Sequence, residues 1–133
     1  MPDCIFCKIA AKKIPSHSVW ENERFFVFAD IKPVNPGHLL IIPKEHTDLI
    51  FDLPDDRYAE IFMIAKMLSA PLKRATDAKR IGIAVEGFGV AHVHLHLVPL
   101  HKISELNPER ARAMDEKEIE TITNKIKEEI EKK

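Results

Sequence analysis

The sequence Ala91-His92-Val93-His94-Leu95-His96-Leu97-Val98-Pro99 places a histidine at every second position between aliphatic residues. A period of two is typical of a strand with one apolar and one polar face. The stretch therefore predicts a strand over 91–99 on which the three histidines share one face. Imidazole titrates near neutrality and serves as base, acid, nucleophile or metal ligand. Three histidines on a strand backed by core residues indicate a chemical role rather than packing.

The length and charge of the chain limit its class. Its 133 residues suit one domain with a single sizeable core. Lys and Arg number 20, Asp and Glu number 21, and the net charge of −1 predicts no general affinity for nucleic acid polymers or anionic membranes. No apolar run is long enough for a transmembrane helix, and the first residues lack a secretory signal pattern. We therefore expect a cytoplasmic protein with no membrane partner.

Apolar periodicity and breaker residues predict the order of the elements. We expect a short helix over 4–12, a hairpin of strands at 18–21 and 24–29, and a loop over 30–37. A buried strand over 38–42, an irregular stretch over 44–53 and a long helix from Pro54 follow, and Pro71 is expected to end or kink that helix. A strand over 80–85, a tight turn over 86–89, the histidine strand and a helix over 116–132 complete the prediction.

The last thirty residues differ in composition from the rest of the chain. Ile119, Ile122, Ile126 and Ile130 form a narrow apolar stripe among Glu and Lys. That stripe suits a helix lying on its own domain and equally a helix facing a partner. We place a domain boundary here, with residues 1–103 as the main domain and 104–133 as a charged helical extension.

Cys4 and Cys7, the only two cysteines, lie three residues apart near the N-terminus. Such a pair in a cytoplasmic chain indicates either metal ligands or a redox pair. Two thiolates would supply half of a tetrahedral zinc site, and histidines would be expected to supply the rest.

Residues 92–98 resemble the His-apolar-His-apolar-His-apolar-apolar signature of the histidine triad (HIT) nucleotide hydrolases and transferases. Further segments follow the order and approximate spacing of that family, so that the resemblance covers residues 3–100. These segments are Cys4-Ile5-Phe6-Cys7-Lys8-Ile9, Ile14-Pro15, Phe28-Ala29-Asp30-Ile31, Pro36-Gly37-His38 and Ile42-Pro43-Lys44-Glu45-His46.

The resemblance implies an α+β fold with a meandering antiparallel sheet, flanked by a short N-terminal helix and a long helix. To this fold the present chain would add its C-terminal helix. It also implies a homodimer formed through the long helix and the adjoining strand. Relatives with the cysteine pair hold a structural zinc ion, and the matching ligands here are Cys4, Cys7, His46 and His92.

The resemblance assigns the catalytic roles as well. His94 would attack the α-phosphorus of a nucleotide and hold the nucleotidyl group, His96 would stabilise the phosphate oxygens, and His38 would orient the other two. A purely local role for His38, capping a strand, stays open. Asp30 would bind the ribose hydroxyls. Phe6, Ile9, Phe28 and Ile31 would enclose the base, although Ile9 suits ordinary core equally well.

The turn before the triad is shorter than in many relatives. Phe88 and Gly89 stand where Gln and a hydroxyl residue are usual, and the backbone N–H of Gly89 is left as the phosphate contact there. His17 and His101 match no motif and are expected at the surface.

The expected function is hydrolysis or nucleotidyl transfer at the α-phosphate of nucleoside phosphoramidates or related nucleoside monophosphate esters, with a purine as the expected base. One alternative is a dinucleoside polyphosphate hydrolase. A second is a nucleotide-binding regulatory module with little turnover.

Overall fold

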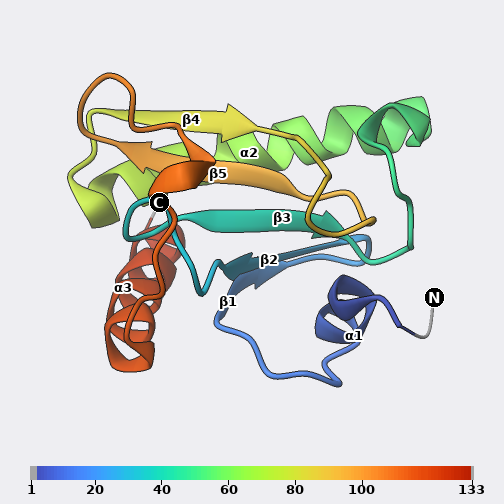
Figure 1. Ribbon diagram of the computed structural model, residues 1–133, viewed down its shortest axis with the longest axis horizontal. Helices are drawn as coiled ribbons and strands as arrows, with labels where there is room; N and C mark the ends of the chain where they lie inside the picture. The colour runs from blue at the N-terminus through green and yellow to red at the C-terminus, as the bar shows by residue number, and fades with distance from the viewer. Residues whose placement is uncertain (1–2, 133) are drawn as a thin grey trace.

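A five-stranded antiparallel sheet organises residues 3–132, the part of the chain that the computed structural model describes (Figure 1). Residues 1–2 and 133, at the outer ends of the two predicted segments, lie outside the described residues. The strands are β1 (Ser18–Glu21), β2 (Phe25–Ala29), β3 (Leu39–Pro43), β4 (Arg80–Ala84) and β5 (Leu95–Leu100). Their order in the sheet is β1-β2-β3-β5-β4, so a three-stranded meander is extended by β5, and β4 forms one edge.

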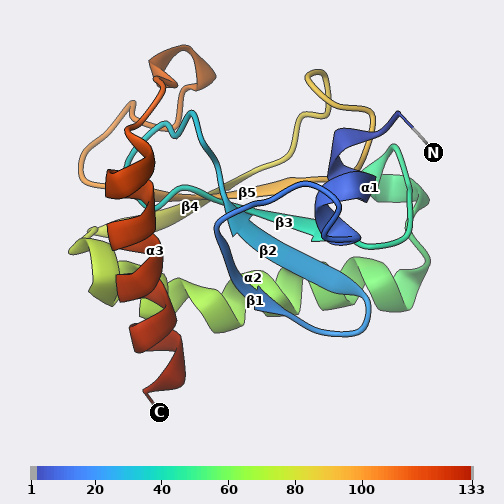
Figure 2. The same cartoon turned by 90° about the horizontal axis from the view of Figure 1, so that it is seen from below.

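Helices flank the sheet, which confirms the predicted α+β fold. Helix α2 (Asp55–Thr76) covers one face, and the short helix α1 (Ile5–Ala10) lies on the other (Figures 1 and 2). Helix α3 (Glu116–Glu131) and α1 lie toward opposite ends of the sheet (Figure 2). Two short 3₁₀ turns, Ile50–Asp52 and Pro108–Arg110, occupy the connections. No helix within residues 3–132 has the length and apolar character needed to cross a bilayer.

Alternating side chains divide the interior into two cores, one on each face of the sheet. In β2, Phe25 and Val27 join the core beneath α2, whereas Phe26 and Phe28 join the smaller core beneath α1. The same alternation in β5 sends Leu95 and Leu97 into the α2 core. His94 and His96 thereby lie on the α1 side of the sheet, where they line a cavity.

The prediction of one continuous histidine strand over 91–99 is wrong in its first half. Strand β5 begins only at Leu95, because the backbone just before it bonds to a loop and not to the backbone of a neighbouring strand. The backbone N–H of Val93 donates to the carbonyl of Thr47 (2.7 Å), and the His92 ring donates to the carbonyl of Pro43 (2.8 Å). Those two bonds join the triad to the Pro-Lys-x-His turn that carries His46.

Pro71 was expected to end or kink the long helix, and it does not end it. Helix α2 continues to Thr76 and stops at Asp77, which takes the left-handed conformation (φ 56°). The buried stripe of Leu68, Leu72 and Ala75 runs past Pro71 into the α2 core. Burial of this stripe outweighs the local cost of the missing proline N–H.

Helix α3 packs on its own domain, which decides between the two interpretations of its apolar stripe. It contacts α2 and β1, and Ile119 (3% exposed) and Ile126 (1% exposed) lie in the α2 core. Arg74 of α2 adds an ion pair with Glu129 at 2.8 Å. The C-terminal extension is therefore integrated into the main core.

Candidate active site and metal cluster

A cavity of about 1150 Å³ lies on the α1 face of the sheet. Its walls come from α1 and the linker after it, from β2 and the loop that follows, from the triad, and from the C-terminal extension. The predicted nucleotide-binding residues all line it, together with two triad histidines: Phe6, Ile9, Phe28, Asp30, Ile31, Gly89, His94 and His96. The fold thus brings together residues that are up to ninety positions apart in the sequence.

His94 is held with one ring nitrogen directed away from the backbone. Its Nδ1 lies 2.7 Å from the carbonyl oxygen of His92. Since a carbonyl only accepts, Nδ1 carries the proton and donates, and the neutral ring keeps its lone pair on Nε2. The ring also packs edge-on against Phe6, with centroids 5.0 Å apart. His94 therefore presents a positioned nucleophilic nitrogen.

His38 and His96 form a directed hydrogen-bond chain. The backbone N–H of Val34 donates to Nδ1 of His38 (3.0 Å), so the proton of the neutral His38 ring lies on Nε2. That Nε2 donates to Nδ1 of His96 across 2.9 Å. His96 in turn must carry its proton on Nε2, where it becomes a donor. The chain fixes His96 as a hydrogen-bond donor, which suits the oxygens of a phosphate.

Burial keeps both histidines of this chain neutral. Desolvation, followed by the nearby His96 ring, lowers the pKa of His38 to about 3. Desolvation, followed by His94, lowers the pKa of His96 to about 4. Both rings therefore stay uncharged at neutral pH, and the donor direction along the chain is preserved. His38 does more than cap β3, which begins one residue later at Leu39.

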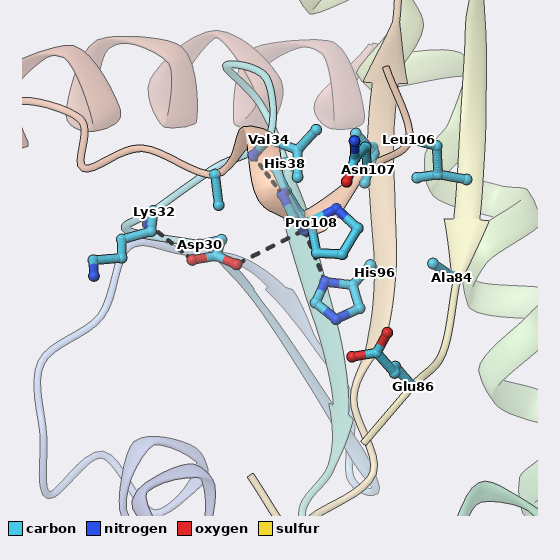
Figure 3. A pocket seen from close by; sticks show the side chains of 12 residues that line it. Asp30, Lys32, Val34, His38, Ala84, Glu86, His96, Leu106, Asn107 and Pro108 are labelled. Atoms are coloured by element: carbon cyan, nitrogen blue, oxygen red, sulfur yellow. Dashed lines mark hydrogen bonds and ion pairs between the residues drawn. The ribbon is translucent and has the colours of Figure 1, made fainter. Parts of the chain in front are cut away.

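Asp30 lies at the end of β2 beside this chain, as Figure 3 shows. Its Oδ1 accepts the backbone N–H of Lys32 (2.9 Å), and its Oδ2 lies 3.8 Å from Nε2 of His38. Burial raises the pKa of Asp30, and the Lys32 N–H and His94 partly offset that effect. The carboxylate keeps acceptor capacity toward the cavity, as a group that binds hydroxyls requires.

The apolar part of the cavity has one rigid side and one open side. Phe6 and Phe28 meet edge to face, with ring centroids 5.7 Å apart, and both are buried. Ile9 is buried in the same core, so it serves packing as well as the cavity wall. Ile31 is 66% exposed and lies at the mouth. A flat ring that enters between these side chains would cover Ile31.

Four predicted metal ligands meet in a second cluster. Cys4, Cys7, His46 and His92 come from three separate segments, and their ligand atoms all lie within 4.8 Å of one another. Nδ1 of His92 lies 3.2 Å from the Cys4 sulfur, and Nδ1 of His46 lies 3.3 Å from the Cys7 sulfur. A tetrahedral zinc ion with bonds of ~2.3 Å to sulfur and ~2.0–2.1 Å to nitrogen separates such atoms by about 3.6 Å.

The protonation of His92 suits a metal ligand. Its Nε2 donates to the carbonyl of Pro43, so the lone pair of the neutral ring lies on Nδ1, the nitrogen that faces the thiols. Burial, followed in importance by the adjacent Cys4 thiol, raises the pKa of Cys7. Two thiolates this close therefore need a cation between them. The donor set and its spacing fit a four-coordinate structural zinc site with no position left for a reactive water.

The shortened turn before the triad reaches the cavity with its second half only. Gly89 and Val90 line the cavity, whereas the Phe88 side chain is 91% exposed and points elsewhere. A Cβ at Gly89 would meet nothing within 4 Å. This part of the cavity wall is therefore backbone with open space around it.

Sequence reasoning missed a polar cluster behind the Pro-Gly-His turn. Glu105 is buried and accepts the backbone N–H groups of His101 (2.6 Å) and Lys102 (3.1 Å), and the Asn35 amide donates to it at 3.2 Å. Arg110 donates to the Asn35 side-chain oxygen (2.8 Å). The carbonyl of Asn35 accepts the N–H of His38 (3.1 Å). The extension is thus tied by side chains to the turn that carries His38.

A second, smaller cavity of about 150 Å³ lies beyond Asp30 and His96 (Figure 3). The extension builds one side of it through Leu106, Asn107 and Pro108, and Glu86 stands at its rim. Asp30 and His96 border both cavities. The extension therefore shapes both spaces around the catalytic candidates.

Comparison with known proteins identifies the family. Residues 11–103 match the family model of the HIT domain, about seventy per cent of the chain. An uncharacterized HIT-like protein of Borreliella burgdorferi is 37% identical over 109 residues, which cover 77% of this chain and 78% of that protein. The chain belongs to the histidine triad family.

Two further relatives bear on activity and metal. The adenosine 5′-monophosphoramidase HNT1 of Saccharomyces cerevisiae is 39% identical over 97 residues, covering 72% of this chain and 61% of the HNT1 chain. The crystal structure of a zinc-bound histidine triad family protein from Mycobacterium smegmatis superposes with a TM-score of 0.84 at 27% identity. That superposition covers 97% of this chain and 94% of the other, so the C-terminal extension is included.

Proposed function

We propose that this protein hydrolyses or transfers the nucleotidyl group of nucleoside phosphoramidates or related nucleoside monophosphate esters. The observation that carries the proposal is the lone pair of His94 Nε2, which the Nδ1–H bond to the His92 carbonyl fixes at the cavity. Its relation to HNT1, which is named a phosphoramidase, supports the same reaction class. Asp30 and the apolar walls suit a ribose and a base.

The reaction would proceed in two displacements at phosphorus. Nε2 of His94 attacks the α-phosphorus and forms an N–P bond, while the leaving group departs with the P–N or P–O bonding pair and takes up a proton from solvent. Water or another acceptor then attacks the same phosphorus and gives up its proton to solvent, and the N–P bond breaks with its electron pair returned to His94. The Nε2–H of His96 stabilises the phosphate oxygens in both steps.

The zinc site would have a structural role in this scheme. Cys4, Cys7, His46 and His92 would hold the ion, and a bound zinc ion supplies cross-linking of three chain segments. His92 would thereby fix the carbonyl that orients His94. Two of the four ligands also connect α1, a wall of the cavity, to the triad.

Rapid quenching in alkaline denaturant tests the proposal directly. A nucleoside phosphoramidate labelled on the α-phosphorus is mixed in excess with the protein and quenched within milliseconds to seconds. We expect label bound to protein through a base-stable, acid-labile linkage, at up to one equivalent per chain. Nucleotide binding with no trapped label and no turnover would instead support the regulatory module. Faster turnover of dinucleoside polyphosphates than of phosphoramidates would favour the other alternative.

We also propose a homodimer formed through α2 and the edge strand β4. Met63 (61% exposed) and Met67 (46%) stand on the outer face of α2, and Ile83 (45%) and Val85 (38%) project from or just after β4. Exposed apolar side chains beside an unpaired strand edge favour pairing with a second copy. Sedimentation equilibrium at micromolar concentration is expected to give twice the chain mass, and Met63→Glu combined with Ile83→Glu is expected to give a monomer.

We further propose that residues 104–133 act as an extension that completes the domain of residues 1–103. The contacts of Glu105 and Arg110 with Asn35, and the burial of Ile119, support this division of the chain. A cytoplasmic location suits the paired thiols, which such a reducing compartment keeps available for metal.

A further inference from the structure

The C-terminal extension supplies a wall of the large cavity on the side away from α1. Ala111, Met114, Glu116 and Ile119 line the cavity from this side. All four lie beyond residue 103, where the match to the HIT domain ends. The wall therefore lies outside the segment that the family model matches, and its residues can carry a specificity that the family motifs do not encode.

Backbone hydrogen bonds fix this wall beside the loop that follows Asp30. The N–H of Met114 donates to the carbonyl of Ile31 (3.3 Å), and the N–H of Arg112 donates to the carbonyl of Pro33 (3.3 Å). If Asp30 binds the ribose, as the proposed function holds, the base attached to that ribose lies next to Ile31. The first residues of α3 consequently stand at the base end of the cavity.

Polar groups gather at this end of an otherwise apolar space. Ser16 and His17, from the linker before β1, line the cavity together with Glu116. Nε2 of His17 lies 3.9 Å from a carboxylate oxygen of Glu116, and the two side chains are 21% and 88% exposed. His17 is thus half-buried in the cavity wall, and the expectation that it lies at the surface is wrong. At this distance the two groups are too far apart for a hydrogen bond but near enough for an ion pair when the His17 ring is protonated, and that charge would orient the neighbouring carboxylate.

We propose that Glu116, oriented by His17, reads the base of the bound nucleotide and selects bases that carry an exocyclic amino group. A carboxylate is an acceptor only, so it pairs with the amino N–H of adenine, guanine or cytosine and repels a carbonyl oxygen at the same position. The inference rests on the proposed function, since it takes the ribose position from Asp30. It adds to that function the part of the substrate, the base, by which this site would distinguish one nucleotide from another.

A structural role for Glu116 makes a different prediction. Glu116 and Glu118 both lie in the first turn of α3, where a negative charge stabilises the helix N-terminus. Glu118 faces away from the large cavity, on the surface around Pro33 and Pro36. Glu118→Ala therefore removes the same charge from the same helix turn without touching the base end, and it serves as the matched control.

The test uses two nucleotides that differ only in the amino group: adenosine 5′-monophosphate and purine riboside 5′-monophosphate. Their dissociation constants are measured by titration calorimetry on the zinc-loaded full-length protein. We expect the wild type to bind the adenine nucleotide about three- to tenfold more tightly, as suits one charge-assisted hydrogen bond to a carboxylate that is largely exposed before the nucleotide binds. Glu116→Ala is expected to bring this ratio close to one, mainly by weakening adenosine 5′-monophosphate, and Glu118→Ala to leave the ratio unchanged.

The outcomes separate this inference from the proposed function. A wild-type ratio of one, or the same ratio in Glu116→Ala as in the wild type, overturns base reading by Glu116 while the catalytic proposal stands. A wild type that binds neither nucleotide overturns both. A ratio that falls equally in Glu116→Ala and Glu118→Ala assigns the effect to helix charge and overturns the inference. His17→Ala is expected to reduce the ratio partway, because the carboxylate remains but loses its orientation.

Discussion

The metal cluster and the cavity each contain one of two neighbouring triad histidines, His92 and His94. The two rings carry their proton on opposite nitrogens. His92 donates from Nε2 to the Pro43 carbonyl and turns Nδ1 toward two thiols. His94 donates from Nδ1 to the His92 carbonyl and leaves Nε2 for the cavity. The ring protonation thus suits the proposed metal role of His92 and the proposed nucleophilic role of His94, although both are neutral imidazoles two residues apart.

This difference shows that a backbone carbonyl can determine which nitrogen of a histidine ring is free to bind or react. In each case a carbonyl oxygen accepts one ring N–H, and the lone pair of the neutral ring is left on the other nitrogen. His96 is assigned in the same way by a neighbouring ring, since Nε2 of His38 donates to its Nδ1. Replacing each histidine should therefore cause a different kind of loss.

The largest effect is expected for His94→Asn. An amide cannot attack phosphorus, so turnover should fall by at least ~10⁴-fold and no label should be trapped after an alkaline quench. Nucleotide affinity should change little, because the ribose and base contacts come from Asp30 and the apolar walls. Single-turnover kinetics with a labelled phosphoramidate measure the loss, and His101→Asn, at an exposed histidine, is the control. A fully active His94→Asn variant would end the nucleophile assignment.

A smaller kinetic effect is expected for His96→Asn. This substitution removes a donor to the phosphate oxygens and leaves the bond-forming group in place. One such donor is worth ~2.7–4 kcal/mol in transition-state stabilisation, or roughly 10²–10³ in rate. Pre-steady-state kinetics should therefore still detect the trapped intermediate, formed more slowly. Equal rates for His94→Asn and His96→Asn would contradict the division of labour between the two rings.

Replacing a metal ligand should affect stability before chemistry. Cys4→Ser is expected to release zinc and to lower the free energy of unfolding by about 3 kcal/mol, which corresponds to roughly 10 °C in Tm. His92→Asn should do the same, because its Nδ1 faces both sulfurs. Metal analysis and thermal unfolding, before and after chelator treatment, measure both quantities. Chelator-free wild type without zinc, or variants with wild-type Tm, would refute a structural metal.

The comparison also separates what the sequence predicts from what it does not. Alternation in 91–99 predicted that Leu95 and Leu97 face the core and that His94 and His96 face the other side, as the two cores confirm. The resemblance to the histidine triad family predicted which cysteines and histidines would meet. The first prediction succeeds because side-chain period constrains it directly, and the second because the chain shares the family's motifs.

The sequence did not predict the protonated nitrogen of each histidine ring or the contacts of the extension with the turn that carries His38, and both omissions have a physical reason. Which nitrogen of His92 or His94 carries the proton depends on carbonyl groups placed by tertiary contacts, and no residue pattern records them. Glu105 lies in a polar stretch with no periodicity, yet it is buried against Asn35, seventy positions away. Only its unusual partners, two backbone N–H groups and an amide, reveal a structural role.

The smallest expected effect is on the pH dependence of stability, and it tests whether His96 stays neutral in the folded protein. Burial, with His94 second, lowers its pKa to about 4, whereas a histidine in the unfolded chain titrates near 6.5. Between these values the unfolded chain binds a proton that the native protein excludes, so the contribution of His96 is complete above pH ~6.5 and is lost as the pH falls toward 4. From pH 7 to 5 the lost contribution to the free energy of unfolding amounts to about 1–2 kcal/mol.

Metal release at acidic pH affects the wild type and His96→Asn alike, so the quantity to measure is the difference between their losses of unfolding free energy. The wild type is expected to lose about 1–2 kcal/mol more than His96→Asn. Equal losses would mean that His96 is protonated as readily in the folded protein as in the unfolded chain, and that burial beside His94 does not hold the ring neutral.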